Sequence, residues 1–290
     1  MPVIAGLLSS AVHSLQAAEA AECTAPRLEA ELLLACALKR DRLFVRMFPE
    51  HVPDDGALEL FWALLARRCQ GEPMAYLLGE KEFYGRPFRV RRGVLIPRPE
   101  TELIIDTVLE DKDLADREEV RFIDLGAGSG CIGLTLQLER PHWQGLLLER
   151  AGVPLAVCAE NRKGLGAGRA LILQADLARA PLKDASLDLV VANPPYIDED
   201  DPEVQAGVRT HEPHEALFAA QHGLADLASC ISTAARVLVP GGLIVLEHGA
   251  QQAEMVRTLL AQQNFLKILT KKDLAGLDRV TLGVYKGRRT

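Results

Sequence analysis

Short apolar segments alternate with helical segments over the second half of the chain, and this alternation constrains the fold more than any other feature. The expected strands are residues 120–125, 145–148, 170–173, 187–192 and 243–247, followed by two around 266–270 and 279–285. Helices are expected at 131–138, 154–165 and 251–262, with another ending near 238. Strands that alternate with helices form parallel sheets covered on both faces. The sequence therefore predicts an α/β fold with a mostly parallel, seven-stranded sheet.

Residues 1–72 have helical periodicity instead. Pro26 suits the first turn of a helix over 28–38, and Asp54 or Asp55 can cap a helix that runs to Arg68. The last helix is expected to bury one face, made of Leu58, Phe61, Trp62 and Leu65. A small helical domain without a titratable cluster is expected to recognise a partner rather than to catalyse.

Three regions follow from these changes of pattern. Residues 1–72 form the helical recognition domain, 73–98 a β-hairpin linker, and 99–290 the α/β domain. Paired short strands are expected at 82–90 and 94–96, and a helix at 102–109. Polar segments at 110–119 and 197–222 are expected to be loops, and Pro240-Gly241-Gly242 a turn into the fifth strand.

Composition narrows the class of protein. The 290 residues are 48% hydrophobic and 25% charged, which is typical of a globular domain, and no apolar run is long enough to span a membrane. Six scattered cysteines without a C-x-x-C pair, together with the lack of a secretion signal, favour reduced thiols and a cytoplasmic location. A net charge of −7 argues against a general nucleic-acid binder. Five arginines near the domain junction could form a solvated face or a docking surface: Arg86, Arg89, Arg91, Arg92 and Arg98.

The tetrapeptide Asn193-Pro194-Pro195-Tyr196 follows the strand at 187–192. Two prolines end the hydrogen-bond ladder and stiffen the turn, so Asn193 should leave the sheet at its carboxyl edge, where open parallel sheets bind ligands. A carboxamide held rigidly there can grip a planar NH2 group. An ordinary strand-to-loop turn explains Asn-Pro alone, but the full tetrapeptide favours a catalytic site.

A glycine-rich turn follows the first strand of the sheet. In the segment Asp124-Leu125-Gly126-Ala127-Gly128-Ser129-Gly130, glycines permit a sharp turn and close approach of a ligand to a helix N-terminus. Gly128, Gly130 and Gly133 also make a literal G-x-G-x-x-G. That pattern alone fits a dinucleotide dehydrogenase equally well, and a purely structural turn remains possible.

Acidic residues end the next two strands. Glu149 can accept hydrogen bonds from both hydroxyls of a ribose, although its neighbour Arg150 offers the alternative of a surface ion pair. Asp176 is placed to accept from the amino group of an adenine, with Leu177 packing on the ring, although an isolated acid after a strand is more often a turn cap. These residues indicate a nucleotide-type ligand.

Two further groups carry weaker signals. His211 and His214 lie in a polar loop that lacks a third ligand of clear spacing, so no metal site is expected; this loop is expected to shape or cover the substrate entrance. Glu247-His248-Gly249 ends the fifth strand at the same edge as the ligand, and a packing or supporting role is expected for it.

Together these motifs resemble the class I methyltransferases, which have a Rossmann-like fold and use S-adenosylmethionine. Three further stretches, residues 83–85, 95–102 and 273–280, make the whole chain similar to the family of bacterial peptide-chain release factor glutamine methyltransferases. The family usually has an aspartate where this chain has Glu149.

The resemblance implies transfer of a methyl group to the side-chain nitrogen of the glutamine in the Gly-Gly-Gln motif of release factors. It implies that Asn193, Pro194 and Tyr196 act in catalysis and that Pro195 and Arg98 also contact the substrate. The implied cofactor residues are Gly126, Ala127, Gly128, Ser129, Gly130, Glu149, Asp176, Leu177 and Asn193.

Alternative functions remain open from the sequence alone. Ribosomal-protein glutamine methyltransferases and DNA adenine-N6 methyltransferases share the tetrapeptide, but the compact helical domain and net acidity disfavour a DNA enzyme. An NAD-dependent dehydrogenase and a non-enzymatic assembly factor that keeps the cofactor fold are the alternatives of other classes. The release factor, without direct contact to nucleic acid or membrane, is the expected partner.

Overall fold

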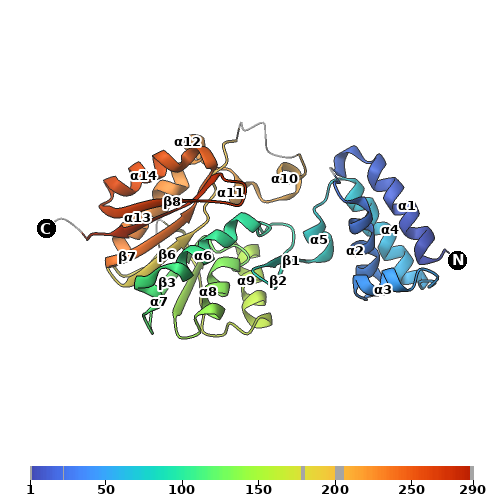
Figure 1. Cartoon of the computed structure of the whole chain (residues 1–290), viewed down its shortest axis with the longest axis horizontal. Helices are drawn as coiled ribbons and strands as arrows, with labels where there is room; N and C mark the ends of the chain where they lie inside the picture. The colour runs from blue at the N-terminus through green and yellow to red at the C-terminus, as the bar shows by residue number, and fades with distance from the viewer. Residues whose placement is uncertain (1, 22, 178–179, 200–205, 288–290) are drawn as a thin grey trace. The chain divides into compact units, whose positions relative to one another are not determined.

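The computed structural model describes residues 2–21, 23–177, 180–199 and 206–287 (Figure 1). The chain divides into two compact units. The first comprises Met1–Glu80 together with Glu203–Glu212, and the second comprises Lys81–Pro202 together with Pro213–Thr290. The first is helical and the second contains the large sheet.

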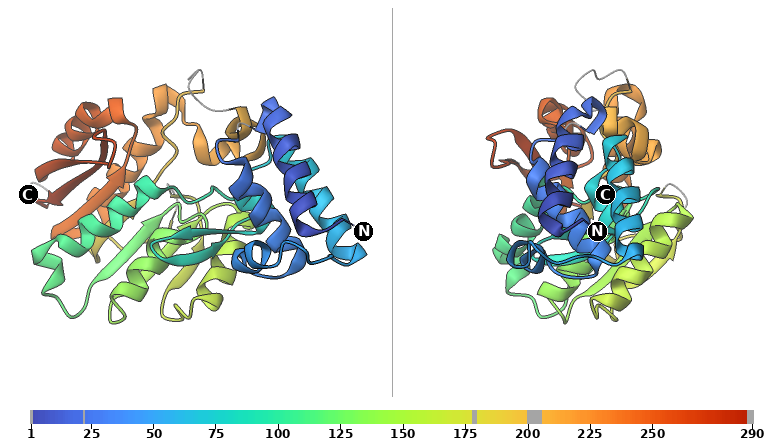
Figure 2. Two further views of the ribbon diagram at one scale, coloured as in Figure 1. Left: turned by 45° about the vertical axis from the view of Figure 1, so that its right-hand side comes forward. Right: turned by 90° about the vertical axis from the view of Figure 1, so that its right-hand side faces the viewer.

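The helical unit is built mainly from α1 (Ile4–Ala17), α2 (Pro26–Leu38), α3 (Arg42–Met47), α4 (Asp55–Cys69) and α5 (Met74–Leu78). It also contains the short 3-10 helix η1 (Glu19–Ala21) and α10 (Ala206–His211). Helices α1, α2 and α4 pack side by side (Figure 2). Their apolar faces enclose one core, which includes Leu7, Leu33, Phe61 and Leu65.

Local sequence signals set the helix starts in this unit. Asp41 and Asp54 each cap a helix, because their carboxylates accept from the backbone N–H of Phe44 and Ala57 at 2.8 Å. Pro26 occupies the first turn of α2, as predicted. The prediction that Trp62 is buried is wrong: its side chain is 42% exposed, because the core-facing stripe of α4 passes through Phe61, Leu64 and Leu65 instead. Helix α5 has no counterpart among the predicted elements.

A two-stranded hairpin, β1 (Glu80–Phe83) and β2 (Arg86–Arg89), follows α5. Tyr84 and Gly85 make its turn with φ of 50° and 71°, the positive values that tight hairpins require. The predicted strand at 94–96 is absent from this part of the structure, where the backbone is irregular. The arginines of this region are largely paired, since Arg86 binds Glu139 at 2.6 Å and Arg91 binds Glu160 at 2.9 Å.

The sheet has seven strands in the order β5-β4-β3-β6-β7-β9-β8. Their bounds are β3 Arg121–Leu125, β4 Gln144–Glu149, β5 Leu171–Gln174, β6 Leu187–Ala192, β7 Leu238–Glu247, β8 Phe265–Lys272 and β9 Asp278–Tyr285. The first five pair in parallel, whereas β9 is antiparallel to both β7 and β8. The predicted mostly parallel, seven-stranded sheet is confirmed.

Helices cover both faces of the sheet (Figure 1). Successive residues of a strand alternate between two cores: in β6, Leu189 and Val191 face one core, while Val190 and Ala192 face the other. The first core contains residues of α6 (Glu102–Glu110) and α8 (Cys131–Glu139), and α9 (Gly152–Gly164) adds Cys158 to it. The second contains residues of α13 (Ala225–Val237) and α14 (Ala253–Gln262). Apolar residues on both faces explain the continuous apolar runs in the sequence.

Three connections differ from the predictions. The segment 197–222, expected as a loop, contains α10, α11 (His214–Leu217) and α12 (Ala220–Gly223), and the expected linker at 110–119 contains α7 (Lys112–Ala115). The Pro240-Gly241-Gly242 turn is instead an irregularity inside β7, whose pairing with β6 jumps from Leu238 to Leu243. Short 3-10 helices η2 (Pro99–Thr101) and η4 (Ala250–Gln252) precede α6 and α14.

Candidate active site

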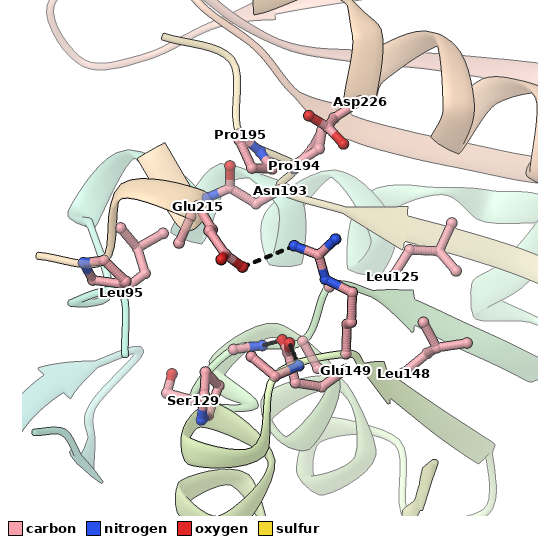
Figure 3. A pocket seen from close by; sticks show the side chains of 18 of the residues that line it. Leu95, Leu125, Ser129, Leu148, Glu149, Asn193, Pro194, Pro195, Glu215 and Asp226 are labelled. Carbon is pink, nitrogen blue, oxygen red and sulfur yellow. Dashed lines mark hydrogen bonds and ion pairs between the residues drawn. The ribbon is translucent and has the colours of Figure 1, made fainter. Parts of the chain in front are cut away.

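A cavity of about 520 Å³ lies at the carboxyl ends of β3, β4, β5 and β6. Figure 3 shows Glu149 and Ser129 on one side of it and Asn193, Pro194 and Pro195 on the opposite side. Its size is in the range of small-molecule and cofactor pockets. Of the predicted site residues, those that line it are Arg98, Gly126, Ala127, Gly128, Ser129, Glu149, Asp176, Leu177, Asn193, Pro194 and Pro195. The other two described site residues, Gly130 and Tyr196, are not in its lining.

The glycine-rich turn is hydrogen-bonded to the end of β4. The backbone N–H groups of Gly126 and Ala127 both donate to the carbonyl of Leu148 at 2.9 Å. Two of the glycines are required by space and backbone: Gly130 has a φ of 81°, and a Cβ there would lie 2.7 Å from the sulfur of Cys158. A Cβ on Gly133 would lie 2.7 Å from Leu147 and 2.9 Å from the Asp124 carboxylate. The turn is therefore pressed against the neighbouring elements, which fixes the shape of the cavity floor.

The carboxylate of Glu149 is held by two backbone donors. Gly128 N–H donates to Oε2 at 2.9 Å, and Ala151 N–H donates to Oε1 at 2.8 Å. Each carboxylate oxygen has a second lone pair, so both can still accept a hydroxyl from a ligand. The alternative ion pair between Glu149 and Arg150 does not form in the structure.

Arg150 instead reaches across the cavity edge. Its guanidinium donates to Glu215 at 2.9 Å, drawn as the dashed line in Figure 3, and lies 4.0 Å from the carboxylate of Asp176. All three side chains are well exposed, which makes these contacts weak. Residues 213–216, including His214, line the cavity, so part of the predicted covering loop does reach it.

Asn193 leaves the end of β6 with its side-chain amide fixed. Its Nδ2 donates to the hydroxyl of Thr101 at 3.2 Å. Thr101 is 1% exposed and ends η2, the short helix that follows Arg98. The stiff Pro194-Pro195 backbone and this hydrogen bond together hold the amide at the cavity wall.

Tyr196 lies beside a buried carboxylate. Its hydroxyl donates to Glu247 Oε1 at 2.9 Å, and Arg279 is also next to this ring. Burial raises the pKa of both Tyr196 and Glu247, and hydrogen bonds from the Thr101 and Tyr196 hydroxyls oppose this for Glu247. Gln252 Nε2 donates to the backbone carbonyl of Tyr196 at 2.8 Å and so fixes the end of the tetrapeptide.

A second buried acid lies below the glycine-rich turn. Asp124 is fully buried at the end of β3, where its Oδ2 accepts from Gly133 N–H at 2.8 Å. Burial raises its pKa to about 7, and the single backbone hydrogen bond only partly offsets this. A carboxylic acid with a pKa so far above its ordinary value is typical of a functional site.

Sequence reasoning missed two residues that shape the site. The role of Thr101 was missed because its neighbours in the sequence are ordinary residues for the start of a helix. Asn161 of α9 is 2% exposed, and its Nδ2 donates to the carbonyls of Ser129 at 2.9 Å and Arg89 at 3.1 Å. It thereby ties the glycine-rich turn to the hairpin. An asparagine on the buried face of a helix was the available signal, since such a residue needs partners.

Two family models match the chain. Residues 7–79 match the PrmC N-terminal domain, and residues 116–279 match a methyltransferase domain. A methyltransferase from Pyrococcus furiosus has a similar fold, with a TM-score of 0.53 and 14% identity, covering 72% of this chain and 92% of that chain. The fold and the family match define a methyltransferase.

Curated relatives identify the particular family. Release factor glutamine methyltransferases from Nitratidesulfovibrio vulgaris, Vibrio cholerae and Escherichia coli are 41%, 39% and 38% identical to this chain. The alignments cover 92%, 91% and 96% of this chain and 91%, 91% and 97% of those proteins. The chain belongs to the release factor glutamine methyltransferase family.

The described part of the chain contains no helix that is long and apolar enough to cross a membrane. All six cysteines are free thiols. Burial raises the pKa of Cys131, which lines the cavity, to about 12, so this thiol is a poor nucleophile.

Proposed function

We propose that this enzyme methylates the side-chain amide nitrogen (N5) of the glutamine in the Gly-Gly-Gln motif of peptide-chain release factors. The observation that carries the proposal is the fixed amide of Asn193 at the wall of a cofactor-sized cavity, across from Glu149 and the glycine-rich turn (Figure 3). The relatives described above act on a release factor glutamine by name. Since this substrate is part of translation, the proposal includes a cytoplasmic location.

The residues of the cavity fit S-adenosylmethionine. Glu149 has free lone pairs for the two ribose hydroxyls, and Asp176 is an exposed acceptor suited to the adenine amino group. Leu177 offers an apolar surface for the adenine ring, and the glycine-rich turn lies beneath. When bound, S-adenosylmethionine supplies a methyl group on a positively charged sulfur.

The protein's task is to orient a poor nucleophile. An amide nitrogen has its lone pair delocalised into the carbonyl, so it attacks only if the N–H groups are held while the lone pair faces the methyl group. Asn193 Oδ1 and the Pro194 carbonyl each accept one N–H of the substrate glutamine, and Tyr196 supports the amide plane. Orientation of this kind can contribute several kcal/mol, roughly 7–11 at most.

The same acceptors stabilise the charge that develops during transfer. The substrate nitrogen would gain positive charge during methyl transfer, and the oxygen acceptors of Asn193 and Pro194 would lower the energy of that state. The proton leaves the nitrogen to water afterwards, so a strong general base is unnecessary. Arg98 lines the cavity, which supports its proposed role in binding the substrate.

Transfer of labelled methyl from S-adenosylmethionine to a purified bacterial release factor tests the proposal. The matched control is the same factor with Gln→Ala in its Gly-Gly-Gln motif. Label in the unmodified factor and none in the control is the expected result. Label in neither, with cofactor binding intact, would overturn the proposed substrate and direct the search to ribosomal proteins and DNA.

A further inference from the structure

Asn161 of α9 joins two segments that border the cavity, although it is not in the cavity lining itself. The residue is 2% exposed, and its Oδ1 accepts from Arg89 N–H at 2.7 Å. Its Nδ2 donates to the carbonyls of Arg89 at 3.1 Å and Ser129 at 2.9 Å. Both amide hydrogens are therefore used. The orientation of this amide is fixed, because the reverse orientation would place oxygen against oxygen and N–H against N–H.

The first of the two segments is the Ser129–Gly130 peptide of the glycine-rich turn. Asn161 holds its carbonyl, and its N–H donates to the Ala127 carbonyl at 2.7 Å. The glycines on either side of Ser129, Gly128 and Gly130, have φ of 58° and 81°. Since glycine adopts either sign of φ at little steric cost, the backbone at this point can rotate unless hydrogen bonds hold it. Asn161 supplies one of the hydrogen bonds that fix this peptide plane.

The same turn orients the carboxylate that is proposed to bind the ribose. Gly128 N–H, one residue before Ser129, donates to Glu149 Oε2 at 2.9 Å. All three residues line the cavity. A rotation of the Ser129–Gly130 peptide would therefore change the floor of the cavity and move the donor that orients Glu149. The expected consequence is weaker binding of the methyl donor.

The second segment begins at Arg89, the last residue of β2. The Asn161 amide pairs with both the N–H and the carbonyl of Arg89, so it fixes the backbone at the point where the hairpin ends. The chain that follows lines the cavity at Gly93, Leu95, Ile96, Pro97 and Arg98. Asn161 therefore ties the floor of the cavity to the start of one of its walls.

We propose that Asn161 is a positioning residue for the methyl donor: its amide holds the Ser129–Gly130 peptide against the end of β2, in the shape that binds S-adenosylmethionine. This inference rests on the proposed function, because it assigns what sets the affinity of the same site. The effect of Asn161 on the ligand passes through the backbone of Ser129 and Arg89.

Asn161→Leu tests the proposal, because leucine has a similar shape and makes none of the three hydrogen bonds. The Kd for S-adenosylmethionine, measured by calorimetry on the full chain, should rise about tenfold or more, as expected when buried hydrogen bonds that shape a binding site are removed. At saturating S-adenosylmethionine, kcat with the release factor should stay within about threefold of wild type, because the loss is one of binding.

The chain offers a matched control at Gln137 of α8. This residue is also a buried carboxamide, at 3% exposure, whose Nε2 donates to the Trp143 carbonyl at 3.0 Å and whose Oε1 accepts from Gly145 N–H at 3.3 Å. Gly145 lies near the amino end of β4, whereas Glu149 and the cavity are at the carboxyl end. Gln137→Met should lower the melting temperature as Asn161→Leu does, but leave the Kd within about threefold of wild type.

A second pair of variants covers the case in which the larger side chains prevent folding. Asn161→Ala and Gln137→Ala leave room for water to reach the backbone groups that lose their partners, so both should be less destabilised. The same difference in Kd is expected between them. Thermal melts of all four variants identify those that are folded at the temperature of the binding measurement.

The outcomes separate this inference from the proposed function. Wild-type enzyme that does not bind S-adenosylmethionine overturns the proposed donor before any variant is compared. Wild-type enzyme that binds it but does not label the release factor overturns the proposed substrate and leaves the comparison of Kd values valid. The positioning role is wrong if a folded Asn161 variant keeps the wild-type Kd, or if the matched Gln137 variant raises the Kd as much.

Discussion

Buried charged side chains are paired in the helical unit, but they are incompletely paired at the ligand edge of the sheet, the edge formed by the carboxyl ends of its parallel strands. In the helical unit, buried Glu31 accepts from Arg27 and Arg42, each at 2.8 Å, and buried Arg68 donates to Glu29 at 2.7 Å. At the ligand edge, Asp124 Oδ1 and Glu247 Oε2 are buried without a hydrogen-bond partner in the described structure.

The difference follows position in the fold rather than membership of a unit. Asp188, at the opposite end of the same sheet, is paired with Arg117 at 2.8 Å. Buried charges that serve only the fold are therefore neutralised by arginine. The two carboxyl groups left incompletely satisfied lie at the carboxyl ends of β3 and β7, at the edge of the sheet that carries the cavity, and groups of this kind are enriched at functional sites.

The largest expected effect is at the ligand edge, where Asn193→Ala removes the acceptor of the substrate N–H. We expect kcat to fall about a thousandfold, roughly 4 kcal/mol, because an acceptor aimed at developing charge is lost. The Kd for S-adenosylmethionine should stay within a few-fold of wild type. Single-turnover transfer and calorimetric binding measure the two quantities. Unchanged turnover would remove Asn193 from the mechanism.

The second largest effect is expected when the buried ion pair between Arg68 and Glu29 in the helical unit is removed. Arg68→Met leaves the mostly buried Glu29 carboxylate without its arginine partner and removes the donor to the Ala21 carbonyl, which lies 2.6 Å from Arg68 Nη2 in the wild type. The free energy of unfolding of the helical unit should fall by about 3 kcal/mol. Denaturant unfolding followed by Trp62 fluorescence measures it, with the exposed Arg46→Met as control, expected within about 0.5 kcal/mol. Equal loss in both variants would contradict the importance of buried pairing.

The incompletely satisfied carboxyl group of Asp124 should make the free energy of unfolding depend on pH. Its pKa is raised from 3.8 to about 7 on folding, so the folded chain holds this proton more tightly than the unfolded chain. Stability is therefore highest while the group is protonated and falls as pH rises through this interval, by at most about 1.4 kcal/mol per pH unit. Above about pH 7 no further loss is expected from this group.

Asp124→Asn removes that titration. Unfolding free energies at pH 5, 6, 7 and 8 without cofactor should show wild type falling relative to the variant by about 2 kcal/mol in total. Parallel curves for the two proteins would mean that the carboxyl group is ionised in the folded state throughout this range.

The smallest effect is expected for the exposed ion pair at the cavity edge. Glu215→Gln removes the contact with Arg150, but both side chains are more than half exposed. The free energy of unfolding should change by less than about 0.5 kcal/mol, and the affinity for the cofactor by less than a few-fold. A tenfold loss of affinity in a binding titration would show that this surface pair is part of the binding site.

Features set by local chemistry were predictable from the sequence. The strand cores, the cap at Asp54, and the turn after β6 depend on residues within a few positions of each other. Trp62 was misassigned because helical periodicity did not decide which of the adjacent residues Phe61 and Trp62 faces the core, and the buried stripe of α4 passes through Phe61, Leu64 and Leu65.

The supporting contacts of the site were not predictable in the same way. Asn193 meets Thr101 across 92 positions, and Tyr196 meets Glu247 across 51. Such pairs depend on which strand ends become neighbours in the sheet. A supporting role at this edge was expected for Glu247, but nothing local in the sequence indicated that its partner would be Tyr196 or that Asn193 would meet Thr101.

The order of the strands also divides the site along the chain. The residues proposed to hold most of the methyl donor, from Gly126 to Leu177, precede β6, whereas Asn193 and Pro194, which are proposed to hold the substrate amide, follow it. Evolution can therefore alter what is methylated by changing residues after β6 and the front of the chain, without disturbing the segment that binds the donor. The pairing of β3 with β6 therefore joins the part of the proposed site that faces the methyl donor to the part that faces the substrate.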